Sequence, residues 1–281
     1  MSLPAQLVPA TLSLAAVLSW GTSDFLGGYA ARRADAFLLT TVAHSSGLLL
    51  VLILASGTHA RFPSLHSVEW ALAGGVSGGL ALAVFYRALA GGSMGLTAPV
   101  AAVLGAAVPT IFGIVTEGAP GPLHMAGFML AGLGIWLISR TEGGNSPAAI
   151  AVAALAGIGF AGFYLCVRQA RDGSAFWIAT FSRTGALAVT GAVVLARRRF
   201  REISLGGIRW GMIAGCLDVM GTVFFIRASQ TGRLDAAVVL TSLYPAVTVL
   251  LARLVLREHF TRWKVLGMFA ALAAVPMITA P

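Results

Sequence analysis

Long apolar stretches recur along the whole chain, and short segments that are polar or contain glycine and proline separate them. A helix needs about 20 predominantly apolar residues to cross the hydrocarbon core of a bilayer. The pattern therefore predicts ten transmembrane helices, and the segments between them leave no room for a soluble domain. The predicted bounds are 9–31, 36–56, 68–90, 95–116, 122–139, 148–167, 174–196, 205–228, 234–256 and 263–280.

The composition agrees with this pattern. Hydrophobic residues make up 58% of the 281 residues and charged residues only 10%, whereas an ordinary soluble domain has roughly 25% charged residues. So few charges cannot supply the polar surface that a soluble protein of this size needs. The composition therefore indicates that lipid surrounds most of the chain.

The charge distribution argues against a nucleic-acid partner. The net charge is +9, but the basic residues are spread singly or in small groups between the apolar stretches, apart from one cluster at 197–201. This distribution is typical of the cytoplasmic loops of membrane proteins. The two cysteines, Cys166 and Cys216, are too few for a disulfide framework or a zinc site. We predict no cofactor and no metal.

The two halves of the chain resemble each other when the sequence is shifted by 140 positions. Trp70 then aligns with Trp210, and the segment 85–88 (Phe-Tyr-Arg-Ala) aligns with 225–228 (Phe-Ile-Arg-Ala). Because five helices per half is an odd number, the second half would be inverted relative to the first. Inverted repeats are typical of transporters, whose substrate site lies near the membrane midplane between the repeats. The predicted units are residues 1–143 and 144–281.

Three features together resemble a known family: five-helix halves, a Trp20-Gly21 pair in the first helix, and a glutamate that ends the fourth helix of each half, Glu117 and Glu258. The chain resembles the ten-helix EamA-type branch of the drug/metabolite transporter superfamily. This resemblance rests on architecture, covers almost the whole chain, and implies an all-α membrane protein with two inverted five-helix repeats. Members move amino acids, sugars, nucleotide sugars or drugs, often outward. One departure is the loop between the second and third helices, often strongly basic in the family, which here holds only Arg61.

Four ionisable residues lie inside predicted helices, where a buried charge is costly unless it is paired. Asp24 and His44 are expected at comparable depths, and Arg183 and Asp218 near the midplane. Because a guanidinium group can bond two oxygens at once, Arg183 is predicted to anchor a carboxylate or phosphate of the substrate. Either aspartate could hold a substrate amine or carry a proton. The alternative role for Arg183 and Asp218 is an ion pair that only fixes helix packing.

Two aromatic residues, Trp20 and Tyr164, are predicted to lie too deep for the aromatic belt at the membrane surface. We expect them to form a wall of the substrate cavity, and the alternative is ordinary core packing. The candidate substrate-binding residues are therefore Trp20, Asp24, His44, Tyr164, Arg183 and Asp218.

Small residues and prolines predict how the helices pack. The glycines within 74–79 form two overlapping small-xxx-small patterns, which allow two helices to approach closely. Pro99, Pro109 and Pro245 lie inside predicted helices, where each removes a backbone hydrogen bond and favours a kink or a hinge.

The sequence favours a multi-pass transporter of the cell (plasma or inner) membrane that moves a small, amino-acid-like or related polar metabolite by alternating access. Export follows from the resemblance alone, and protons are a candidate coupling ion. The alternative is an intramembrane enzyme. Residues 75–78 (Gly-Val-Ser-Gly) match the GxSG pattern of rhomboid proteases, and that chemistry needs a histidine base within reach of Ser77. His44 is the one histidine deep in a predicted helix.

The orientation in the membrane follows from the basic residues in the loops. The loops at one end of the predicted bundle hold five basic residues and those at the other end hold eleven. The end with more basic residues is expected in the cytoplasm, which places both termini outside. The family resemblance implies the opposite, with both termini inside.

Overall fold

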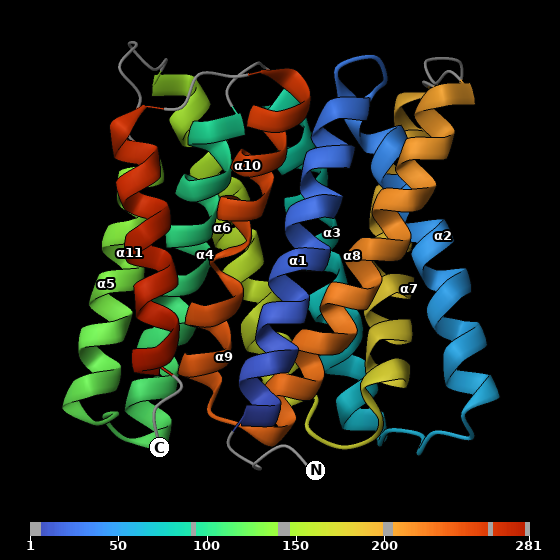
Figure 1. Ribbon diagram of the computed structural model, residues 1–281. Helices are drawn as coiled ribbons and strands as arrows, with labels where there is room; N and C mark the ends of the chain where they lie inside the picture. Colours follow the sequence, from blue (N-terminus) through green and yellow to red (C-terminus); the bar gives the residue numbers. More distant parts are fainter. Residues whose placement is uncertain (1–6, 91–93, 140–146, 199–204, 258–260, 279–281) are drawn as a thin grey trace.

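The computed structural model is a bundle of α-helices (Figure 1). It describes residues 7–90, 94–139, 147–198, 205–257 and 261–278, and within these ranges every regular element is a helix. The helices are α1 (Leu7–Ala31), α2 (Ala36–Gly57), α3 (Leu65–Ala90), α4 (Met94–Glu117), α5 (Pro122–Ser139), α6 (Pro147–Gln169), α7 (Ala175–Arg197), α8 (Leu205–Thr231), α9 (Leu234–Thr241), α10 (Tyr244–Leu256) and α11 (Arg262–Ile278).

The outer bounds of the ten predicted helices agree with the structure to within three residues. In the described part of the chain, seven helices are long and apolar enough to cross a membrane by length and composition, and the α9–α10 segment counts as one of them. The all-helical prediction is therefore confirmed, as is the presence of several helices able to span a bilayer.

The predicted helix at 234–256 is wrong in one respect, because the structure divides it into α9 and α10. Pro245 has no N–H and cannot donate to the carbonyl group of Thr241, so the regular hydrogen-bond ladder fails one turn earlier. The backbone N–H groups of Leu243 and Ala246 bond the carbonyl groups three residues before them, at 3.2 and 3.0 Å. The break lies inside the bundle, where α10 begins with the buried Tyr244.

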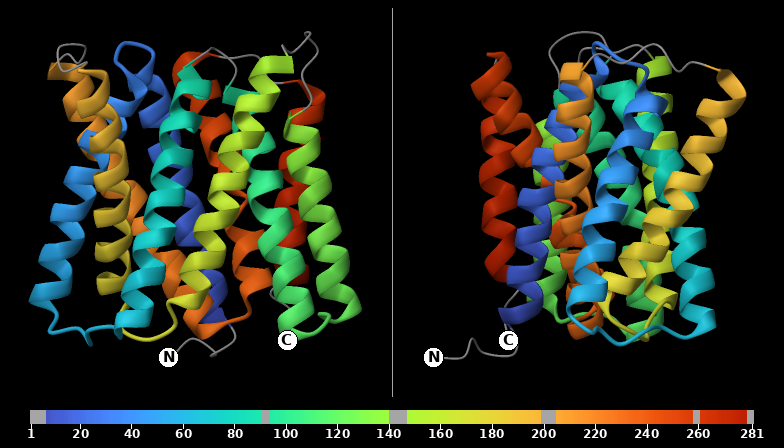
Figure 2. Two further views of the ribbon diagram at one scale, coloured as in Figure 1. Left: turned by 180° about the vertical axis from the view of Figure 1, so that it is seen from behind. Right: turned by 90° about the vertical axis from the view of Figure 1, so that its right-hand side faces the viewer.

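The successive spans run alternately up and down the bundle, with α9 and α10 following each other in the same direction, and the start of α1 lies at the same end as the end of α11 (Figure 1). In this view α1 runs upward and α6 runs downward. The pair α5 and α11 packs along one side of the bundle, and α2 and α7 form the opposite side (Figure 2). The helices α1, α3, α4, α6, α8 and α9–α10 fill the space between these two pairs.

Most of the extensive packing joins helices from different halves of the chain. Helix α1 packs on α8 and α3 packs on α6, while α2 packs on α8 and α3 packs on α7. When α1 to α3 are matched with α6 to α8, the contact of α1 with α8 corresponds to that of α6 with α3. The contact of α2 with α8 corresponds in the same way to that of α7 with α3. The cleft described below lies among α1, α3, α6, α7, α8 and the start of α10.

The two small-residue patterns of α3 face two different helices. A methyl group on Gly75 or Gly79 would meet backbone atoms of α7, at Ser182 and Ala186 respectively. A methyl group on Gly74 or Gly78 would instead meet side chains of α6. The absence of side chains therefore lets α3 approach α6 on one face and α7 on the other.

Candidate functional site

A small cleft, with a cavity volume of about 60 Å³, lies in the middle of the bundle. Its walls come from α1, α3, α6, α7, α8 and the first residue of α10. Five of the six residues predicted from the sequence line it, and all five are buried. They are Trp20, Asp24, Tyr164, Arg183 and Asp218.

The sixth predicted residue, His44, lies behind the wall of the cleft and is only 1% exposed. Its Nδ1 atom lies 3.1 Å from Nη1 of Arg183. Because a guanidinium group can only donate, Nδ1 of His44 must be the acceptor. A histidine that accepts through one ring nitrogen is the neutral form, so His44 adds no charge to the site.

Arg183 is surrounded by acceptors from the protein itself. Its Nη1 atom forms an ion pair with the carboxylate of Asp218 in addition to the contact with His44. Its Nη2 atom donates to Oγ1 of Thr222 at 2.5 Å and to the backbone carbonyl of Asp218 at 3.5 Å. Each Nη atom thus has two partners, and the positive charge of Arg183 is balanced by Asp218.

Asp24 has a different environment from Asp218. It is 5% exposed, lines the cleft, and lies one turn from Trp20 on α1. Among the residues that the structure describes, no hydrogen bond or ion pair reaches its carboxylate group. Asp218 lines the same cleft, but its charge is paired with Arg183. The site therefore contains a buried carboxylate that its surroundings do not neutralise.

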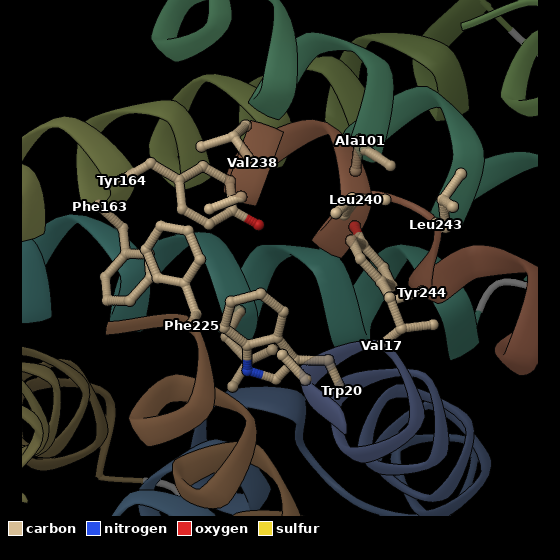
Figure 3. Close-up of a cluster of buried hydrophobic side chains, with 14 of the residues drawn as sticks. Val17, Trp20, Ala101, Phe163, Tyr164, Phe225, Val238, Leu240, Leu243 and Tyr244 are labelled. Atoms are coloured by element: carbon tan, nitrogen blue, oxygen red, sulfur yellow. The ribbon is translucent and has the colours of Figure 1, made fainter. Parts of the chain in front are cut away.

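The aromatic residues form a packed cluster that also faces the cleft (Figure 3). The ring of Trp20 lies 6.1 Å from that of Tyr164 and 5.7 Å from that of Phe225, between centroids. Nε1 of Trp20 donates to the backbone carbonyl of Asp218 at 3.1 Å, which fixes the indole between α1 and α8. Core packing and cavity lining, weighed as alternatives from the sequence, thus apply to the same side chains.

Among the residues that line the cleft but were missed from the sequence, Thr222 and Tyr244 contribute hydroxyl groups to the site. Thr222 follows Asp218 by one helical turn and holds Arg183. Tyr244 begins α10 and is buried, and within the described ranges its hydroxyl group has no hydrogen-bond partner. Figure 3 shows the hydroxyl ends of Tyr164 and Tyr244 turned toward the same region. A tyrosine directly before the helix-breaking Pro245 was the available signal, because the chain has only four tyrosines.

The geometry gives no support to the rhomboid alternative. Oγ of Ser77 donates to the backbone carbonyl of Gly159 at 2.8 Å, which joins α3 to α6. Nδ1 of His44 accepts a hydrogen bond from Arg183. A serine nucleophile needs the histidine as its hydrogen-bond partner, and the two side chains have other partners here.

At one end of the bundle a polar cluster joins four helices, and we call it the Glu117 network. Glu117, the last residue of α4, forms an ion pair with Arg168 near the end of α6, and its Oε2 accepts from the backbone N–H of Leu234 at 3.2 Å. Nη1 of Arg233 donates to the backbone carbonyl of Glu117 at 3.2 Å, and its Nη2 pairs with Asp235 at 2.7 Å. Arg168 also donates to the backbone of α8 at 3.3 Å. Glu117 thus makes capping and loop contacts at the end of α4, whereas its repeat counterpart Glu258 lies outside the described residues.

Comparison with known proteins agrees with this architecture. Residues 147–280 match the model of the EamA-like transporter family. A solved structure described only as "Crystal structure of protein" has the same fold, with a TM-score of 0.76 over 98% of this chain and 98% of that chain, at 16% sequence identity. No curated protein matches the chain. The family match confirms the resemblance to EamA-like transporters over residues 147–280, and the shared fold confirms the architecture of the chain.

Proposed function

We propose that this chain, an EamA-type member of the drug/metabolite transporters, exports a small polar, amino-acid-like or related metabolite across the plasma or inner membrane by alternating access. The observation that carries the proposal is a cleft in the middle of an apolar bundle with buried charged and aromatic side chains in its walls. Such side chains are costly inside a membrane and usually mark the path of a solute or ion. The outward direction rests on the family resemblance.

The proposed site consists of the six residues predicted from the sequence. Trp20, Asp24 and Tyr164 contact the solute directly, and Arg183 and Asp218 form the polar wall. His44 holds Arg183 from behind. A substrate carboxylate could use the Nε–H of Arg183, which has no partner among the described residues, or displace one of the present partners of the Nη atoms. Protons are proposed as a coupling ion, with Asp24 as the carrier because its carboxylate is unpaired in the described part of the chain.

Export measurements over a panel of metabolites test the proposal. Cells that express the protein are expected to release at least one amine- or amino-acid-type metabolite faster than cells that do not express it. Purified protein in vesicles should then exchange the same metabolite. If no solute in the panel responds in cells or in vesicles, the transport proposal is wrong.

The proposed membrane topology has ten spans in two inverted repeats, residues 1–143 and 144–281. It is supported by the opposite directions of α1 and α6 in Figure 1 and by the helix pairs that recur in the two halves. A residue-level match supports it further. A Cβ atom at Gly75 would overlap the backbone of Ser182. A Cβ atom at Gly215, 140 positions later, would overlap the backbone of Ala43.

Inversion predicts that equivalent loops lie on opposite sides of the membrane. We expect Arg33→Cys, after α1, and Arg171→Cys, after α6, to react with an impermeant thiol reagent from opposite sides, in a background without Cys166 and Cys216. Reaction of both from one side would contradict the inverted arrangement. The charge distribution predicts both termini outside, and the family resemblance predicts both inside. A C-terminal reporter that is active on only one side of the membrane decides between these two orientations.

Alternating access also needs contacts that close one end of the bundle and break when that end opens. The Glu117 network fits this role, because it joins α4 of the first half to α6, α8 and α9 of the second half. We propose it as the closure of that end.

Glu117→Gln is expected to open this end more often, since it removes the charge that pairs with Arg168. Losing a charged hydrogen-bond partner at a half-buried site costs about 1–3 kcal/mol. The measurement is the rate at which Ser182→Cys, in the cleft, reacts with a thiol reagent added from that side. The rate should rise several-fold with Glu117→Gln and stay unchanged with Glu69→Gln, which removes an exposed charge from α3. An unchanged rate with Glu117→Gln would show that the Glu117 network only caps helices and does not close this end of the bundle.

A further inference from the structure

The charges that line the cleft do not cancel. They belong to Asp24, Arg183 and Asp218. Arg183 is paired with Asp218, and His44 behind them is neutral because its Nδ1 accepts from Arg183. The carboxylate of Asp24 is left over, 5% exposed and without a cationic partner in the ranges that the structure describes. An empty cleft therefore has one uncompensated negative charge, or one bound proton, on Asp24.

The walls around Asp24 suit a positive charge better than any other group. Five aromatic side chains line the cleft: Trp20, Phe160, Phe163, Tyr164 and Tyr244. The face of an aromatic ring attracts a cation, most strongly when both are removed from water. Tyr164 and Tyr244 line the cleft together with Asp24, and their hydroxyl ends are turned toward the same region (Figure 3). The hydroxyl group of Tyr244 is buried and, in the described part of the molecule, unpartnered.

The same groups disfavour an anion. Asp24 would repel it, the charges of Arg183 and Asp218 balance each other, and each Nη atom of Arg183 already has two acceptors, which leaves only its Nε–H without a partner in the described residues. A zwitterion would gain at its ammonium end and lose at its carboxylate end. The charge balance of the cleft is therefore met by a proton on Asp24 or, in its place, by a solute with one net positive charge.

We propose that the cleft binds a singly charged organic cation, with a primary or quaternary ammonium group against Asp24 and an apolar or aromatic body between Trp20, Tyr164 and Tyr244. This inference deepens the proposed function and rests on it for the conclusion that the bound cation is also transported. Asp24 selects the substrate through its negative charge. The aromatic residues bind the apolar or aromatic body of the substrate.

Four probes that share a phenyl group but differ in charge test the inference. They are 2-phenylethylamine, benzyltrimethylammonium, the zwitterion phenylalanine and the anion 3-phenylpropanoate. Binding to the full-length protein in lipid nanodiscs is measured by calorimetry, with empty nanodiscs to subtract partition into lipid. We expect both cations to bind the wild-type protein at least about tenfold more tightly than the other two probes.

Three variants then locate the charge that is responsible. Asp24→Asn keeps the size of the side chain and is expected to lose about tenfold or more in affinity for the cations. Asp24→Glu should recover part of that affinity, and Glu69→Gln, which removes an exposed carboxylate, should leave it unchanged. All variants are compared at equal amounts of monodisperse protein.

Equal affinity of the wild-type protein for the four probes would overturn the inference, and this comparison does not depend on whether a variant folds. Cation binding that Asp24→Asn leaves unchanged would overturn it as well. Flux in vesicles is recorded separately. Selective cation binding without flux supports the cation site and contradicts the transport function. Transport of the zwitterion or the anion that does not depend on Asp24 supports a transporter and overturns the cation site.

Discussion

Gly75→Leu is expected to remove most of the folded protein. Gly75 lies where α3 crosses α7, and any Cβ atom there would overlap the backbone of Ser182. The backbone of a helix cannot rotate away as the end of a side chain can, so the two helices would have to separate. Separation would also open the contact between Gly79 and Ala186 one turn further along. Overpacking of a core costs typically about 1–3 kcal/mol and sometimes more, and we expect the upper part of this range or beyond.

The measurement is the monodisperse fraction after extraction in a mild detergent, together with the temperature at which that fraction is lost. Gly215→Leu should behave like Gly75→Leu, because a Cβ atom at Gly215 would overlap the backbone of Ala43 in the equivalent α8–α2 contact. Gly191→Leu is the matched control, since no atom lies within 4 Å of a Cβ atom at that position of α7. Normal extraction and stability of Gly75→Leu would show that α3 and α7 are not held in close contact.

The helices could be predicted well from the sequence because a membrane imposes their length and requires every backbone group to be satisfied within the segment. The break between α9 and α10 could not be predicted as such. Pro245 was recognised as a site for a kink, but the continuous apolar stretch at 234–256 indicates one span. Whether a proline bends or interrupts a helix depends on what packs against the freed carbonyl groups, and this is a property of the tertiary structure.

The charged members of the cleft could be predicted because ionisable residues are rare inside apolar helices. Depth estimates placed Arg183 near Asp218, but they could not show which helix faces meet. The contact of Arg183 with His44 and the hydrogen bond of Trp20 with the backbone of Asp218 join helices from different halves of the chain. Thr222 and Tyr244 are uncharged and lie in apolar surroundings, so their roles appear only once the helices are packed.

A second large effect, on the yield of folded protein, is expected when the ion pair of Arg183 and Asp218 is broken by a single substitution. Asp218→Asn removes the negative charge and leaves Arg183 as a buried cation that is 7% exposed. Breaking a buried pair by removing one partner costs about 3–5 kcal/mol. The single variant should therefore yield much less folded protein. The double variant Arg183→Met with Asp218→Leu should recover most of the folded protein, because replacing both charges with apolar side chains of similar size is often neutral or stabilising.

Flux in vesicles at matched folded protein then separates a structural pair from one in the solute path. We expect the double variant to fold and yet to carry little solute, because the polar wall of the cleft becomes apolar. Arg183→Lys should also lose most of the flux. An ammonium group keeps the charge, but its three donors lack the planar geometry that lets the guanidinium group bond Asp218, His44 and Thr222 together. Near-normal flux from the double variant would show that Arg183 and Asp218 serve only to hold α7 against α8, and it would leave Asp24 and the aromatic residues as the solute-binding part of the cleft.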